Sequence, residues 1–163
     1  MSRSANEVMT LAAKAARGAG APPAQAAHFG RAALCHLGAD RPEANLTAAL
    51  DALPGGPIIA LPRFFAQLAE QAVDGRAQCK QATETLIKSY ADAQSYDCQT
   101  TATSDSLTVT MDLTKPADRH KLKRIVLSDA FFRHLEDLAA KLLVPESDAS
   151  RLSGAGAGLT DND

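Results

Sequence analysis

The sequence contains no tryptophan and few other aromatic residues, with two Tyr and five Phe among 163 residues. Aromatic side chains, which bury about 150–250 Å² each, therefore cannot dominate the core. Hydrophobic residues still make up 45% of the chain, and many of them are alanine. A chain of this length buries roughly 70% of its unfolded surface, so it needs no disulfide or structural metal. We expect a single globular domain over residues 1–145, with closely packed small-residue helices.

Cysteine and long apolar runs are also scarce. Cys35, Cys79 and Cys98 are odd in number and lack C-x-x-C spacing, so we predict that they neither pair nor bind metal. The longest uncharged apolar stretch, residues 53–62, is interrupted by Pro and Gly and is shorter than the ~20 residues that span a bilayer. Residues 1–20 lack the pattern of a signal peptide. These features predict a soluble, cytoplasmic protein without a membrane partner.

Charges of neither sign predominate, since the formal net charge is −2, but their distribution along the chain is uneven. Residues 115–134 contain six basic side chains against two acidic ones, and residues 136–163 contain six acidic side chains against two basic ones. Such neighbouring segments usually pair within one molecule or with a symmetry mate. Nucleic acid is therefore an unlikely partner, because no aromatic residues are interleaved with the basic ones.

The first third of the sequence predicts helices. Ser4 and Glu7 have the spacing of a capping box, which predicts a helix over residues 5–17 that ends at Gly18. Pro22 and Pro23 predict the start of a second helix that reaches residue 37, antiparallel to the first. A similar signal from Asp40 to Glu43 predicts a short third helix over the apolar positions up to residue 53.

The middle of the chain is less clearly patterned. Residues 58–61 are too short to classify and predict either an edge strand or an extended entry to a helix that Pro62 begins. Gly75 should end that helix. Spaced apolar residues then favour a further helix over residues 78–93.

Period-2 alternation follows and predicts an antiparallel hairpin of residues 96–103 and 107–113 with one polar face. A third strand over residues 123–127 and a helix that Ser128 caps, over residues 128–144, should cover the apolar face. We expect this face to consist of Leu107, Val109, Met111 and Leu113. The fold class predicted is therefore α+β, with a helical N-terminal half, a small antiparallel sheet and a C-terminal helix.

Residues 146–163 form a tail rich in Gly, Ala and Ser. Its GAGAG run, residues 154–158, is not a phosphate-binding loop, because only five residues remain to form the helix that such a loop requires. Its composition is typical of a flexible tail. The alternative is a docking segment in which Leu159 anchors while Asp161 and Asp163 meet the basic residues 115–124.

Known catalytic spacings are missing. His28 and Cys35 lie two helical turns apart, about 10.5 Å, which is too far for a nucleophile and its base. His120 and His134 have no metal-ligand spacing, so no metal or other cofactor is predicted. The polar residues retained as candidate ligand-binding residues are Arg124, His134, Ser150 and Arg151.

The two ends of the sequence carry a family resemblance. Residues 4–20 read SANEVMTLAAKAARGAG and residues 144–163 read VPESDASRLSGAGAGLTDND. They resemble the ends of an uncharacterised bacterial family, a domain of unknown function whose C-terminus reads close to VPxSExSRxxGAGAGxxDND. The matching ends cover about a fifth of the chain, and the family's tryptophan after Gly20 is replaced here by Pro22 and Pro23. The resemblance implies a bacterial protein and no particular activity.

Two functional hypotheses remain open. The first is a non-catalytic interaction or accessory subunit that self-associates or binds a protein partner. The second is a small-molecule-binding domain or small enzyme, with its pocket between the helical portion and the sheet. A flat apolar patch with an ordered tail would favour the first hypothesis. A deep pocket with converging polar groups would favour the second.

Overall fold

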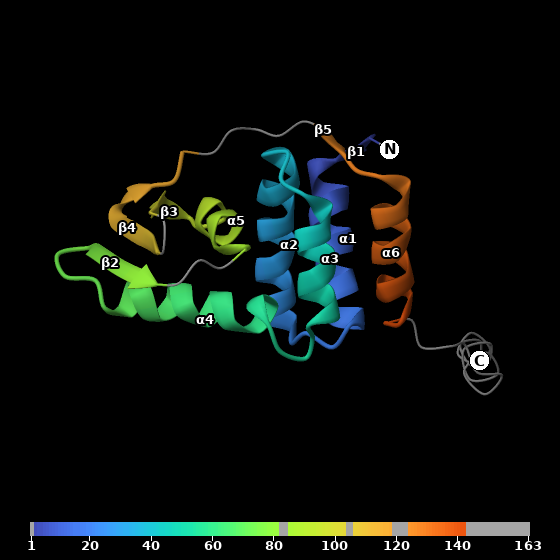
Figure 1. Ribbon diagram of the computed structural model, residues 1–163, viewed down its shortest axis with the longest axis horizontal. Coiled ribbons are helices and arrows are strands. Elements are labelled where there is room, and N and C mark those ends of the chain that lie inside the picture. The colour runs from blue at the N-terminus through green and yellow to red at the C-terminus, as the bar shows by residue number, and fades with distance from the viewer. Residues whose placement is uncertain (1, 82–84, 104–105, 119–123, 143–163) are drawn as a thin grey trace, which may run out of the picture.

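The computed structural model describes residues 2–81, 85–103, 106–118 and 124–142. The helices are α1 (Ala5–Gly18), α2 (Pro23–Gly38), α3 (Glu43–Asp51), α4 (Pro57–Glu70), α5 (Ile87–Asp92) and α6 (Asp129–Ala140), and the strands are β1 (Ser2–Ser4), β2 (Arg76–Gln81), β3 (Tyr96–Ala102), β4 (Leu107–Pro116) and β5 (Arg124–Val126). The molecule is elongated, with a block of helices at one end and a small sheet at the other (Figure 1). The α+β class with a helical N-terminal half is confirmed.

The helices α1 and α2 form the antiparallel pair that the sequence predicts (Figure 1). The capping box of α1 is formed, because Ser4 N donates to Glu7 Oε2 at 2.8 Å and Glu7 N donates to Ser4 Oγ at 3.2 Å. Small side chains line the contact between the two helices, and six alanines are almost fully buried there: Ala12, Ala15, Ala16, Ala26, Ala32 and Ala33. Small residues allow the two backbones to approach closely.

The third and fourth helices depart from the predicted boundaries. The second capping box does not form, because Glu43 accepts hydrogen bonds from Ser128 instead of from its own helix start. Helix α4 begins at Pro57, so Pro62 lies inside it and residues 58–61 form its first turns. Ile58 and Leu61 are buried, which explains an apolar run that periodicity alone could not classify.

The three-stranded sheet has the order β2-β4-β3, with both pairs antiparallel. The predicted hairpin is confirmed as β3 and β4, and Leu107, Val109 and Met111 are buried, whereas Leu113 is only half-buried. The predicted helix over residues 78–93 is wrong, since its first part is β2 and only Ile87–Asp92 is helical. Asp74 and Gly75 have φ values of 50° and 78° and form a tight turn that leads into β2.

The third strand and the C-terminal helix form as predicted but lie elsewhere. Strand β5 pairs with β1 instead of joining the hairpin, with Arg3 opposite Ile125. Helix α6 packs on α1, so close that a Cβ at Gly18 would lie 1.8 Å from the Leu138 carbonyl oxygen. The prediction that this helix covers the sheet is therefore wrong. The inner face of the sheet contacts α4 and α5 instead (Figure 1).

The start of α6 depends on Ser128. Its hydroxyl accepts a hydrogen bond from Phe131 N at 3.1 Å, as the sequence predicts for an N-cap, and it also donates to Glu43. We expect Ser128→Ala to lower the free energy of unfolding by about 1 kcal/mol, because the helix loses its cap. Urea denaturation followed by circular dichroism measures this. Ser128→Thr is the control, and a loss equal to that of the alanine variant would contradict a capping role.

Candidate functional site

A cavity of about 500 Å³ lies between the helical block and the sheet. Its helical wall is the second half of α2, with Arg31, Leu34 and Cys35, and its opposite wall is the chain from α5 into β3, with Asp92 and Asp97. The remaining lining residues close its ends: Ala5, Met9, Gly38, Ala39, Ala91, Ala93, Tyr96, Cys98, Ala117 and Asp118. The cavity thus sits where the helical and sheet portions of the fold meet.

Packing of α5 between α2 and β3 creates this cavity. Helix α5 contacts both elements, and its inner side buries Ile87, Tyr90 and Ala91. Helix α5 ends at Asp92 and β3 begins at Tyr96, so three residues connect the two elements of this wall. Ala91 and Ala93 are small lining residues at the end of α5, and the space next to them is left open.

A series of hydrogen bonds that begins at the buried His36 and ends at the exposed Asp92 fixes the cavity wall. His36 on α2 and Ser89 on α5 are fully buried, and His36 Nδ1 lies 2.8 Å from Ser89 Oγ. His36 Nε2 lies 2.9 Å from the carbonyl oxygen of Pro42. Arg41 Nη1 donates to Ser89 Oγ at 2.8 Å, and Arg41 Nη2 forms an ion pair of 2.6 Å with Asp92 Oδ2. This series of hydrogen bonds therefore connects the buried His36 to Asp92, which lines the cavity.

The hydrogen bond between His36 Nε2 and the Pro42 carbonyl oxygen determines the tautomer of His36. A carbonyl oxygen can only accept, so His36 Nε2 carries the proton, and Nδ1 accepts from the Ser89 hydroxyl. Burial lowers the pKa of His36, and the positive charge of Arg41 lowers it further. His36 is therefore neutral at pH 7. Because Ser89 is fully buried and bonded on both sides, the pair acts as a structural link and not as an exposed nucleophile.

Negative charge predominates among the described residues that line the cavity. They include three carboxylates, Asp92, Asp97 and Asp118, and one guanidinium, that of Arg31. The thiol of Cys98 responds to this environment: burial raises its pKa to about 12, and the charges of Asp97 and Asp92 contribute in the same direction. A negative charge is thus disfavoured at this wall.

Cys98 should consequently be a slow nucleophile, because only the thiolate reacts with alkylating agents. At pH 8 we expect iodoacetamide to modify Cys98 at least about 100-fold more slowly than it modifies free cysteine, whose pKa is about 8.5. Mass spectrometry of tryptic peptides gives the rate for each thiol, and Cys79, which does not line the cavity, serves as the internal comparison. Equal rates at Cys98 and Cys79 in the folded protein would contradict this prediction.

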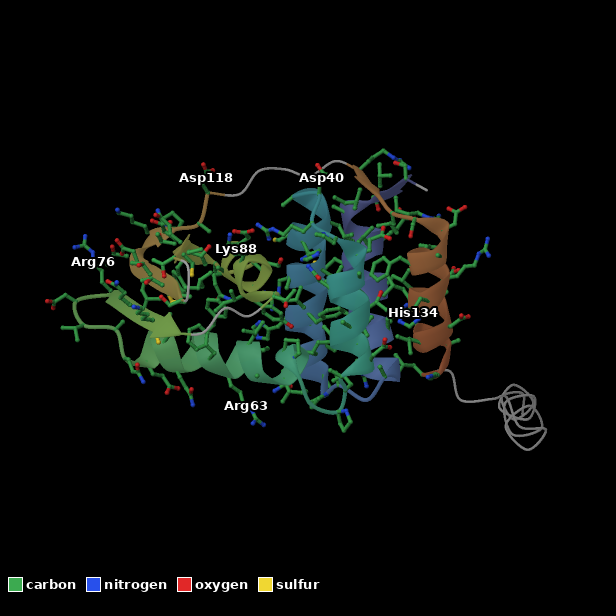
Figure 2. The ribbon with its side chains drawn as sticks, in the orientation of Figure 1. Asp40, Arg63, Arg76, Lys88, Asp118 and His134 are labelled. Carbon is green, nitrogen blue, oxygen red and sulfur yellow. The ribbon has the colours of Figure 1, made fainter. Side chains whose placement is uncertain are left out.

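Two of the four predicted ligand-binding residues, Arg124 and His134, lie away from the cavity. Arg124 lies on β5, where its Nε donates to Ser2 Oγ and its Nη2 donates to the Ser2 carbonyl, both at 2.9 Å. His134 lies on α6, on the far side of the helical block from Asp118 (Figure 2). Ser150 and Arg151 lie outside the described residues, as do the tail-docking residues Leu159, Asp161 and Asp163. The structure thus does not bring Arg124 or His134 to the cavity.

The cysteine and metal predictions can be compared with the described residues. No disulfide joins Cys35, Cys79 and Cys98, and each is half-buried. Cys35 lines the cavity whereas His28, on the same helix, does not, so the two form no dyad there. Residues 2–81, 85–103, 106–118 and 124–142 contain no group of three or more His, Cys, Asp or Glu placed to hold a metal ion.

Comparison with known proteins yields no relative. No family model, curated protein or solved structure matches the chain. The resemblance to a bacterial family of unknown function therefore stays a prediction. Within the described part of the chain, no helix is both long and apolar enough to cross a membrane.

Proposed function

We propose that this protein binds a small molecule in the cavity between α2 and β3. The observation that carries the proposal is the cavity itself, with a volume of about 500 Å³. Small-molecule sites occupy about 300–1,000 Å³ and combine apolar walls with a few polar groups. The lining fits this description, since it combines the apolar Met9, Leu34 and several alanines with Arg31 and three aspartates.

The rigidity of the wall also supports binding. His36, Ser89 and Arg41 connect α2 to α5 through side chains that are held on both sides. Asp92 is the last member of this series of hydrogen bonds and lines the cavity. A site whose walls are fixed before binding loses less conformational entropy when a ligand enters.

Methionine methyl groups provide a test, because Met9 lines the cavity and Met111 is buried in the sheet core. The protein is labelled with ¹³C at the methionine methyl groups and titrated separately with benzylamine and benzyl alcohol as probes. We expect saturable shifts at Met9 and none at Met111. If neither probe shifts Met9, or if Met111 shifts together with Met9, the proposal is wrong.

A blocking variant completes this experiment. Ala39→Leu places a larger side chain at the cavity lining, and Ala66→Leu makes the same change on the exposed side of α4. Binding should be lost in Ala39→Leu and unchanged in Ala66→Leu. Equal probe affinities in the two variants would show that the probes bind elsewhere.

An accessory or interaction role, with self-association in the bacterial cytoplasm, is the first hypothesis from the sequence, and we propose it as the second candidate function. It has less support, since the exposed large hydrophobic residues of the described chain lie on separate elements: Val73, Tyr96, Val126 and Leu142. Isolated apolar residues of this kind are normal on a soluble surface. Sedimentation velocity over a range of protein concentrations measures self-association directly.

A further inference from the structure

On the basis of the proposed cavity function, we propose that its ligand is an organic cation: an amine on a small apolar body. The inference concerns the class of ligand and uses the charges that surround the cavity. A ligand charge that enters a partly enclosed site loses water, so the sign of the surrounding charges decides which ligands enter.

Among the described residues that line the cavity, the carboxylates outnumber the cations available to neutralise them. Asp92 is paired with Arg41, which leaves Asp97 and Asp118 facing the single guanidinium of Arg31. In the part of the chain that the structure describes, neither Asp97 nor Asp118 forms an ion pair with a basic side chain. Asp97 receives only the weak amide contacts of Gln99 Nε2, at 3.4 and 3.5 Å. An ammonium group would supply the missing positive charge.

Helix ends add to the negative potential. Both α2 and α5 direct their C-terminal ends at the cavity, through Gly38 with Ala39 and through Asp92 with Ala93. The C-terminal end of a helix carries a partial negative charge that favours cations. The N-terminal end of α1 also reaches the cavity at Ala5, but the carboxylate of Glu7 bonds to it and offsets its positive charge.

Apolar and aromatic groups fit the rest of such a ligand. Met9, Leu34 and Ala91 contact the cavity without offering a charge, and they suit a small hydrocarbon body. Tyr96 lies beside Asp97 with 45% of its surface exposed, so its ring is available to a cation. Ammonium groups bind favourably over aromatic rings.

Three probes of similar size and different charge test the inference: benzylamine, benzyl alcohol and benzoate. Affinities come from the Met9 methyl shift in low-salt buffer at pH 7. We expect benzylamine to bind at least about tenfold more tightly than benzyl alcohol, and benzoate to bind weakest, because opposite charges attract within the site. Added salt should weaken benzylamine binding and leave that of benzyl alcohol unchanged.

The isosteric variant Asp97→Asn identifies the charge responsible. It should weaken benzylamine binding by about fivefold or more and leave benzyl alcohol binding unchanged, since it removes a charge and keeps the shape. Arg31→Gln is the matched control with the opposite sign, and it should strengthen benzylamine binding or leave it the same. Equal benzylamine affinity in Asp97→Asn and the unaltered protein would overturn the inference.

The outcomes separate this inference from the proposed function. If benzyl alcohol or benzoate binds as tightly as benzylamine and shifts only Met9, the cavity is a binding site but the cation inference is wrong. If none of the three probes shifts Met9, both the proposed function and the inference are wrong.

Discussion

Gly30→Ala should lower the free energy of unfolding by about 2 kcal/mol, although alanine favours helices more than glycine does. A Cβ at Gly30 would lie 2.6 Å from the carbonyl oxygen of Met9 and 3.0 Å from the Cβ of Ala13. A backbone oxygen cannot rotate away, so α1 and α2 must separate. Overpacking of this kind costs about 1–3 kcal/mol, and the upper end applies where backbone atoms collide. The gain of about 1 kcal/mol in helix propensity offsets only part of that cost.

Urea denaturation measures the free energy of unfolding of Gly30→Ala and of its control, Gly55→Ala. A Cβ at Gly55 would meet only the Ala52 carbonyl oxygen at 3.6 Å, which is an ordinary contact, so this control should be neutral or slightly stabilising. Gly30→Ala should also weaken probe binding, because Met9 belongs both to the helix contact and to the cavity. An unchanged or increased stability of Gly30→Ala would show that the helices tolerate separation.

Local signals in the sequence predicted local structure well. The capping box of Ser4 and Glu7, the Ser128 cap and the period-2 hairpin all depend on residues within a few positions of each other, and each is confirmed. Such signals are reliable because the interacting groups are fixed by the geometry of one element. The helix over residues 78–93 was predicted wrongly because only one local signal was used. Apolar spacing there is typical of a helix, whereas the tight turn formed by Asp74 and Gly75 leads the chain into β2.

Contacts between distant segments could not be predicted in the same way. The sequence predicts a strand over residues 123–127, but the partner of the observed strand β5 is β1, at the other end of the sequence. The Glu43 carboxylate, which resembled part of a local cap, instead binds Ser128, 85 positions away. The apolar face of a helix or strand must be buried, but its sequence does not specify which of several surfaces covers it. The topology is therefore needed to identify the partner.

The cavity residues were missed for a related reason. They come from α1, α2, α5, β3 and the two residues that follow β4, and no two of these segments form a sequence motif together. Asp97 and Arg31 are ordinary surface charges when considered alone. Their common location follows from the packing of α5, which lies between α2 and the sheet (Figure 1). The sequence could suggest a pocket between the helices and the sheet, but it could not identify its lining.

His36→Phe should lower the free energy of unfolding by about 3 kcal/mol, more than any other single change considered for this protein. The ring of phenylalanine fills the space but offers no partner to the Pro42 carbonyl or to the Ser89 hydroxyl. The Ser89 O–H is left without an acceptor in a buried place, which costs about 1–3 kcal/mol. The lost bond to the Pro42 carbonyl costs about 0.5–1.5 kcal/mol more, although that carbonyl still accepts from Asn45 N. His28→Phe is the matched control, since His28 lies on the exposed side of the same helix and its replacement should change stability by less than about 0.5 kcal/mol.

The pH dependence of stability provides a second readout that a simple packing defect would not alter. Burial and the Arg41 charge lower the pKa of His36 in the folded protein, so the unfolded chain binds a proton more readily. The stabilisation is therefore complete above the unfolded value of about 6.5 and declines as the pH falls from there toward the lower folded value. His36→Phe cannot bind that proton, so its stability should change less between pH 7 and pH 5. If the unaltered protein and His36→Phe lose stability in parallel over this range, protonation of His36 does not control the link between α2 and α5.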